Sequence, residues 1–311
     1  MGRYLVRRLG QTALVLLLLS VVVFVISRLS GSPVSLMLPE GASDEQRDQL
    51  VAKLGLDESY PQQYWTFLVN ALQGDFGQST RFQTAALPLV LDRLPNTIVL
   101  ASTALVVAVL VGIPLGTLAA LHHGRATDHV TTTLLATGQA APSFWVGILL
   151  ILVFGVQLQW LPFSDFESWR SLVLPALTLS ILPTVTIARV TRSSVLGVLP
   201  EDYVRTARAK GLRRRAVVRG HVMRNALIPV VTIVGLVLGS ALSGAVITEQ
   251  IFSWPGVGAL AIEAIKARDY AVVQAVTMIT ALIVVVLNLV VDLSYFLLDP
   301  RIRRTGGRAA A

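Results

Sequence analysis

Cysteine is absent from the sequence, so disulfide bonds and thiolate metal sites are excluded. Charged residues are also scarce: they make up only 14% of the chain, whereas 54% of the residues are hydrophobic. The mean hydropathy of +0.68 is too high for a soluble globular protein. The composition therefore predicts an integral membrane protein.

Motifs for nucleotide binding and catalysis are missing as well. Glycine never precedes lysine, so the phosphate-binding loop G-x-x-x-x-G-K-S/T does not occur. Neither H-E-x-x-H nor G-x-S-x-G is present. His122, His123 and His129 cluster, but solvated loop positions suffice to explain them without a metal ion. We expect this chain to be no enzyme, with no catalytic residue, no metal site and no bound cofactor.

Six apolar runs are long enough to cross a bilayer, which takes about 20 residues. They cover approximately residues 9–29, 97–121, 132–158, 172–190, 227–247 and 272–298. The first run follows a basic head, but it exceeds the apolar core of a signal peptide, and no small-residue cleavage site precedes Arg28. We predict an all-α, polytopic membrane protein with six transmembrane helices, the first of them uncleaved.

The charges in the loops predict the orientation. The first inter-span loop carries eight acidic and four basic residues, whereas the N-terminus, the 191–226 loop and the tail are basic. The formal charge of +8 therefore indicates topology, and we expect no nucleic acid partner. Both termini are predicted to be cytoplasmic. The predicted regions are an N-terminal helix (1–30), an extracytoplasmic region (31–96), a core (97–300) containing a cytoplasmic loop (191–226), and a cytoplasmic tail (301–311).

Two outward-facing loops are expected to hold structure of their own. In the 31–96 region the pattern predicts short helices over 44–54 and 60–72, and a turn at 74–79. This region is either a lid over the outer ends of the spans or a lid that also contacts a substrate-delivery protein. The 248–270 loop is predicted to be a re-entrant hairpin or a surface helix, with a turn at Trp254, Pro255 and Gly256.

A basic island at 200–229 interrupts the apolar chain. Pro200 suits a first helical position, and Gly211 is placed to end that helix in a left-handed conformation. Beyond it, the stripe of Val217, Val218, His221 and Val222 predicts a second helix that can lie flat on the membrane. The helix over 200–210 is predicted to dock on another protein; the alternative is that the basic residues only anchor the chain to anionic lipid headgroups.

Several residues inside the apolar runs are candidates for gating or packing. Prolines in three neighbouring runs mark places where helices can bend. Small residues spaced four apart permit close helix approach in the fifth run. A carboxylate in the last run is costly and has either a function or a structural partner. These candidates are Pro114, Pro142, Pro183, Gly235, Gly239 and Asp292.

Nine segments, in order, resemble the B-type membrane permease subunits of dipeptide, oligopeptide and nickel ABC importers. They include GDFGQS (74–79), DYVRTARAKGL (202–212), GAVITEQIFSWPGVG (244–258) and NLVVDLSYFLLDPRIR (288–303). The others are MGRYLVRRL, RLPNTIVLA, PSFW, ARVTRSSVL and RDYAVVQAV. The resemblance implies the type I ABC importer transmembrane fold in the cytoplasmic (inner) membrane. It also implies a second homologous permease subunit, two ATPase domains that hold ATP and magnesium, and an extracytoplasmic substrate-binding protein.

The resemblance also implies which residues couple the chain to the ATPase. In that family a short cytoplasmic helix, Glu-Ala-Ala, three residues, then Gly, docks in a groove of the ATPase subunit. Alignment on Gly211 puts Arg205, Thr206 and Ala207 on the Glu-Ala-Ala positions, so this chain departs from the general motif. The coupling residues expected from it are Glu201, Asp202, Tyr203, Arg205, Thr206, Ala207, Arg208, Lys210 and Gly211.

The function that the resemblance implies is import by alternating access, driven by the partner ATPases. Peptides are the expected cargo, and nickel or glutathione are alternatives with the same architecture. A secondary transporter would be expected to show an inverted repeat and midplane charges, and neither is evident in the sequence. The residues that line the translocation cavity are left unassigned.

Overall fold

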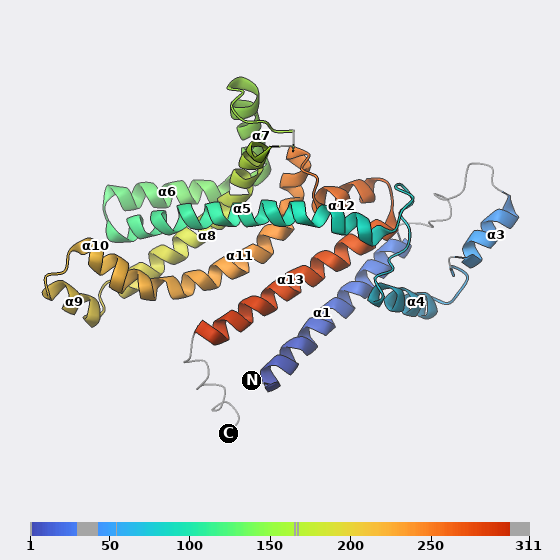
Figure 1. The fold of residues 1–311 in the computed structure, drawn as a ribbon, viewed down its shortest axis with the longest axis horizontal. Helices are drawn as coiled ribbons and strands as arrows, with labels where there is room; N and C mark the ends of the chain where they lie inside the picture. The colour runs from blue at the N-terminus through green and yellow to red at the C-terminus, as the bar shows by residue number, and fades with distance from the viewer. Residues whose placement is uncertain (1, 30–42, 54, 165, 167, 299–311) are drawn as a thin grey trace. The chain divides into compact units, whose positions relative to one another are not determined.

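The computed structural model of the chain describes residues 2–29, 43–53, 55–164, 166 and 168–298. The predicted tail at 301–311 and part of the 31–96 region lie outside these residues. The chain divides into two compact units, one comprising residues 1–97 and 255–285 and the other residues 98–254 and 286–311. Figure 1 shows the helices of the two units with their labels.

The first unit contains the N-terminal span and the segments that surround the predicted outer loops. Its elements are α1 (Gly2–Leu29), α3 (Asp44–Lys53), α4 (Tyr60–Leu72), the start of α5 (Ala86–Leu121), α12 (Val257–Lys266) and the start of α13 (Tyr270–Leu298). Val90, Leu260 and Val272 are buried together, which joins α5, α12 and α13 in one core. The short helices predicted over 44–54 and 60–72 are confirmed.

Aromatic side chains hold α4 against α1 in this unit. Phe24 of α1 lies 5.5 Å from Tyr64 and 5.9 Å from Phe67, measured between ring centroids. The hydroxyl groups of Ser20 and Tyr64 are hydrogen-bonded at 2.9 Å. Part of the predicted outer loop is thus tied to a membrane span, because aromatic pairs at these separations are favourable beyond the area that they bury.

The second unit is built around α8 (Val173–Val198). Its other elements are the rest of α5, α6 (Ala126–Ala140), α7 (Ser143–Leu150), the π-helical η1 (Ile151–Gln157), the 3-10 turn η2 (Trp169–Leu172), α9 (Asp202–Ala209), α10 (Arg214–Val217), the π-helical η3 (Val218–Val222), α11 (Met223–Phe252) and the end of α13. Buried residues join α5, α8 and α11 at two levels, Leu100 with Ala176 and Ala245, and Ala108 with Ile187 and Val230. α8 also packs against α6 and α7.

Five helices among the described residues are long and apolar enough to span a membrane. A sixth span is counted if α6 and α7 are taken together, since this pair passes the same test but is bent by 99°. The predicted third span, 132–158, is thus broken within its length, at one of the prolines that the sequence marked as a place where a helix can bend. Pro142 lies at the break, and Ala141 before it has φ −73° and ψ 126°, because a residue that precedes proline is pushed out of the helical region.

Two helix boundaries differ from the sequence expectation for the same reason. α5 begins at Ala86, not at Thr97, and α11 continues to Phe252, beyond the predicted end at Ile247. Each apolar run was ended at the nearest polar or charged residues, whereas the helix continues past them and buries further residues: Ala86 and Val90 in α5, and Thr248, Glu249 and Phe252 in α11. The 248–270 loop then contains the short helix α12, whose buried Val257, Leu260 and Ala264 belong to the first unit's core.

The candidates for gating or packing differ in how deeply they are buried and in which helices they contact. Pro114 is exposed on α5, whereas Pro183 is buried inside α8. Gly239 is buried on α11, and Gly235 lies so close to α13 that a Cβ there would come within 2.6 Å of a methyl group of Val291. Asp292 falls within α13, but its side chain is not among those that the structure describes. Their roles in gating or packing stay predictions.

Gly116 provides a test of helix packing in the second unit. We expect Gly116→Ala to lower stability by about 1–3 kcal/mol, because the new Cβ would collide with the backbone oxygen of Ala188 and lie 2.8 Å from Cβ of Thr191. Gly138→Ala is the matched control, since its Cβ would meet Val185 at an ordinary 3.5 Å. The melting temperature of each purified variant in detergent is the measurement, and equal values would contradict the assigned packing.

Candidate functional site

The helix predicted to dock on another protein is present as α9, Asp202–Ala209. It starts later than expected: Pro200 is not a first helical residue, because the amide of Glu201 still donates to the carbonyl of Val198 in the turn that ends α8. Glu201 is the N-cap residue instead. Lys210 is the C-cap, and Gly211 follows at φ +77°, the left-handed conformation predicted for it.

One face of α9 is anchored in a cluster of buried apolar residues. Val204 and Ala207 are its members on α9, with exposed fractions of 0% and 4%. They pack with residues of α5, α8, α10, η3 and α11, near which α9 lies in Figure 1. We call this set the α9 anchor cluster: Ala120, Val195, Val204, Ala207, Val217, Val222 and Ala226. A displacement of α9 would therefore act directly on α5, α8, α10, η3 and α11.

Hydrogen bonds reinforce this attachment. The amide of Asn225 at the start of α11 donates to the hydroxyl of Tyr203 over 2.8 Å. The guanidinium of Arg214 donates to the carbonyl of Leu121 at the end of α5 over 2.9 Å. Ser194 of α8 donates to the carbonyl of Ala226 over 2.8 Å. The ends of α5, α8 and α11 are thus linked to one another beneath α9.

The second helix predicted in the basic island is not a separate surface helix. α10, η3 and α11 follow without a break from Arg214 to Phe252, and η3 is a π-helical turn within that helix. Val217 and Val222 are buried against α9, not directed to the membrane. The prediction was wrong because an apolar stripe shows that a helix face is covered but not what covers it.

The opposite face of α9 is polar and open. Asp202, Arg205, Thr206, Arg208 and Lys210 are all exposed. Arg205 lies 3.7 Å from Asp202, but both side chains are so exposed that this pair adds little to stability. Of the predicted coupling residues, Ala207 is thus turned into its own subunit, whereas Arg205 and Thr206 are available to a partner. Val204, the main anchor, was missed because a lone valine between charges carries no signal.

An ion pair between a buried carboxylate and a partly exposed arginine lies in the second unit. Asp128, 4% exposed, accepts hydrogen bonds from Nε and Nη2 of Arg192, each over 2.8 Å. It also contacts Nδ1 of His123 at 2.9 Å and accepts from the amide of Gly124 over 3.1 Å. This arrangement ties the α5–α6 turn to α8. Nothing in the sequence pairs Asp128 with Arg192. His123 is an exposed residue of the turn, as the sequence interpretation had it, and also contacts this carboxylate.

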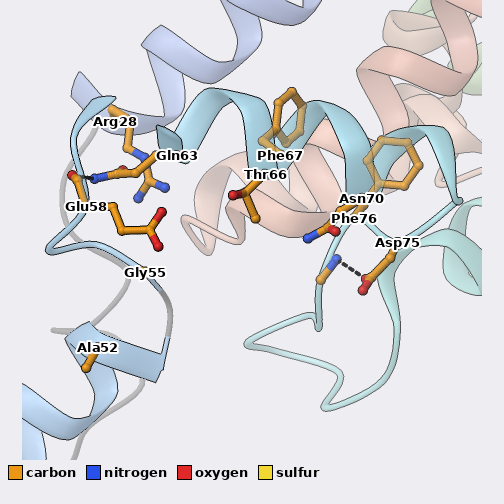
Figure 2. A pocket seen from close by; sticks show the side chains of 11 residues that line it. Arg28, Ala52, Gly55, Glu58, Gln63, Thr66, Phe67, Asn70, Asp75 and Phe76 are labelled. Atoms are coloured by element: carbon orange, nitrogen blue, oxygen red, sulfur yellow. Dashed lines mark hydrogen bonds between the residues drawn. The ribbon is translucent and has the colours of Figure 1, made fainter. Parts of the chain in front are cut away.

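A polar pocket of about 490 Å³ lies in the first unit (Figure 2). Arg28, Glu58 and Gln63 line one end, and Asp75, which accepts from the amide of Gly77 over 2.8 Å, lies at the other. The amide nitrogen of Gln63 donates to the carbonyl of Glu58 over 2.7 Å, while its oxygen has no partner among the described residues. The pocket gives the 31–96 region a charged surface. Whether this region also contacts a delivery protein stays a prediction.

Comparison with known families identifies the architecture. Residues 112–304 match the family model of the binding-protein-dependent transport system inner membrane component, and residues 1–101 match the corresponding N-terminal model. The chain belongs to this family of permeases. The permease is thus a multi-pass subunit of the inner membrane that works with other components of an ABC importer, as the sequence resemblance implied.

Curated relatives cover the permease almost completely. The oligopeptide transport system permease protein AppB of Bacillus subtilis is 40% identical, covering 97% of this chain and 99% of its own. The glutathione transport system permease protein GsiC and the dipeptide transport system permease protein DppB, both of Escherichia coli K12, are 39% and 38% identical with the same coverage. These relatives place the permease among the B-type subunits.

Solved structures agree on the fold. The MetNI methionine ABC transporter in inward-facing conformations matches with a TM-score of 0.55 at 14% identity, covering 68% of this chain and 96% of the matched chain. An amino acid ABC transporter crystallised with histidines matches with a TM-score of 0.54 at 16% identity, covering 67% and 93%. The predicted ABC importer transmembrane fold is therefore confirmed.

Proposed function

We propose that this permease carries peptides into the cell as one half of the membrane channel of an ATP-driven importer. The supporting observation is that relatives aligned over 97% of the chain are permeases of oligopeptide, dipeptide and glutathione systems, and glutathione is itself a tripeptide. A second homologous permease completes the channel, and an extracytoplasmic binding protein delivers the cargo. Nickel remains an alternative cargo that none of these relatives favours.

The energy comes from two partner ATPase domains, which hold ATP and magnesium. α9 is the element by which these domains move the permease. Its polar face, with Arg205 and Thr206, contacts the ATPase, while Val204 and Ala207 hold the helix in the α9 anchor cluster. ATP-driven closure of the ATPases then displaces α9, and the displacement passes to α8 and α11. The permease can adopt two conformations, and the ATPases can shift the balance between them only if they bind α9 with different affinity in each conformation.

The proposed orientation follows from the charges. The loop that carries α9 must be cytoplasmic to reach the ATPases, and both termini are placed on the same side by their basic residues. Labelling of single cysteines introduced into the permease tests this directly, because the natural sequence has none. A cysteine at Arg208 is expected to react with a membrane-impermeant maleimide only after the cells are opened. Reaction in intact cells would contradict the orientation.

Isolation of the complex tests the proposed function as a whole. The tagged permease is extracted in a gentle detergent together with whatever subunits it retains, and the ATPase activity of the complex is assayed with peptides, glutathione and Ni²⁺. Recovery of a second permease and ATPases, with stimulation by peptide-loaded binding protein, is the expected result. Stimulation by Ni²⁺ alone would overturn the peptide assignment, and a lone chain would overturn the importer assignment.

Arg205→Glu tests the docking face of α9. We expect it to reduce ATPase co-purification and peptide uptake at least tenfold, because a carboxylate would replace a cation on the exposed face without disturbing the buried one. Arg219→Glu is the matched control: Arg219 is also an exposed arginine of the basic island, but it lies in η3. If both variants impaired uptake alike, anchoring to anionic lipid would explain the basic residues better than docking does.

A further inference from the structure

Two arginines lie one turn apart on α8, and their surroundings differ. Arg192 is neutralised by Asp128, as described above. Arg189 is exposed, and it has neither an ion pair nor a hydrogen bond among the described residues. α8 lies within a candidate membrane span, where a charged side chain is costly unless it meets an opposite charge or water. Arg189 is therefore a cation that water can reach and that is available to an anionic ligand from outside this chain.

Arg189 lines an open hollow of about 250 Å³ between α6 and α8. Gln139 lines it from α6, and within the described part of the chain its side-chain amide is also without a hydrogen-bond partner. The hydroxyl of Thr186 is already engaged, since it donates to the carbonyl of Leu182 over 3.0 Å. The unused donors in the hollow are therefore the guanidinium of Arg189 and the amide of Gln139.

Packed helices hold these two donors in place. α6 lies within contact distance of α8 at Gly138, where a Cβ would meet Val185 at an ordinary 3.5 Å. Leu135, Val185 and Ala188 are buried in one cluster beside the hollow. α6 ends one residue beyond Gln139, where the chain turns at the break before Pro142. The donors are thus presented from two helices that are fixed against each other.

We propose that Arg189 and Gln139 bind the C-terminal carboxylate of the peptide as it passes through the permease, an inference that rests on the proposed function. A guanidinium presents parallel N–H donors that match the two oxygens of a carboxylate, and an amide nitrogen adds a third donor. Every unmodified peptide carries this carboxylate whatever its side chains are. The site would therefore serve cargo of varied sequence.

The hollow suits one end of a peptide. Its volume is smaller than the ~300–1,000 Å³ that is typical of pockets enclosing a whole small ligand. Leu182 and Val190 offer apolar surface beside the two donors, which fits a terminal residue whose side chain varies. A carboxylate of the second permease would meet the charge requirement equally well, and the experiment below distinguishes this protein contact from cargo binding.

The test compares uptake of trialanine with uptake of trialanine amide in cells that express the complete transporter. The binding protein is the same in every variant, so its own preference cancels when the acid-to-amide ratio of a variant is divided by that of the wild type. We expect Arg189→Gln to lower trialanine uptake about tenfold and to leave the amide unchanged. Arg189→Lys should restore part of the ratio, and Gln139→Leu should lower it by a smaller factor.

The control is Arg125→Gln, which removes a cation from the N-cap of α6, outside the hollow, and should not change the ratio. An equal fall in the uptake of both peptides by Arg189→Gln would overturn the inference and indicate contact with the second permease. An unchanged uptake of both would also overturn it. If the wild-type transporter took up neither peptide, the proposed function itself would fail, and this inference would fall with it.

Discussion

Ala207→Asp is expected to abolish ATPase co-purification and peptide uptake. Ala207 is 4% exposed in the α9 anchor cluster, whose members are apolar, so an aspartate there would bury a carboxylate among apolar side chains. An uncompensated buried charge costs about 3–5 kcal/mol. α9 holds only two residues in the cluster, and a cost of this size is sufficient to detach the helix from α8 and α11 while the spans stay folded.

The measurement is limited proteolysis of the purified permease alongside the uptake assay. In the Ala207→Asp variant, trypsin should cut rapidly within 202–210, where Arg205, Arg208 and Lys210 supply the sites, whereas the wild type is cut slowly. Ala209→Asp is the matched control, because Ala209 is exposed on the same helix and its carboxylate would stay in water. Slow cleavage of the Ala207→Asp variant would contradict the anchoring of α9 described above.

Arg192→Met is expected to destabilise the second unit by up to about 3 kcal/mol, the low end of the cost of leaving one partner of a buried ion pair alone, because Arg192 is itself 25% exposed. Asp128 would keep only the contacts with His123 and Gly124, while its carboxylate stays buried. The thermal melting of the purified permease in detergent measures the loss. The α5–α6 turn would also lose its attachment to α8, so uptake should fall with the melting temperature.

Two further variants make this result specific. Arg189→Met removes an arginine one turn away that has no partner among the described residues, so its melting temperature should stay near that of the wild type. The double variant Asp128→Leu with Arg192→Met removes both charges and should recover most of the stability, since the penalty arises from the unpaired carboxylate. A double variant less stable than Arg192→Met would show that the pair does not act as described.

The docking segment shows how far sequence reasoning extends. Local signals are strong at a helix end, because a left-handed glycine satisfies the last carbonyls at low cost, and Gly211 does adopt φ +77°. The predicted start of α9 was wrong because Pro200 is compatible with a turn as well as with a first helical position. The faces of α9 were not assigned at all, since the burial of Val204 and Ala207 depends on helices up to about 90 residues away in the chain.

The three candidate prolines also show which features the sequence predicts and which depend on helix packing. The sequence marked Pro114, Pro142 and Pro183 alike as points where helices can bend. Pro183 lies inside the continuous helix α8, while the chain breaks by 99° at Pro142. A proline removes the same hydrogen bond in each case, but neighbouring helices determine whether the helix continues through it. Pro142 follows a helix that ends in Gly138, Gln139 and Ala140, and the next helix packs on α8 in a different direction.

The sequence by itself determined the class of protein, the approximate positions of the apolar spans, the presence of a polar helix in the basic island, and the family. These properties depend on composition, on runs of about 20 apolar residues and on short motifs, all of which are local along the chain. The tertiary structure alone decided that Ala207 faces inward, that Asp128 neutralises Arg192 and that Arg189 is left without a partner among the described residues. Such facts depend on which residues of different helices meet, and helix contacts in a membrane protein are set by close packing and polar pairing that no single segment encodes.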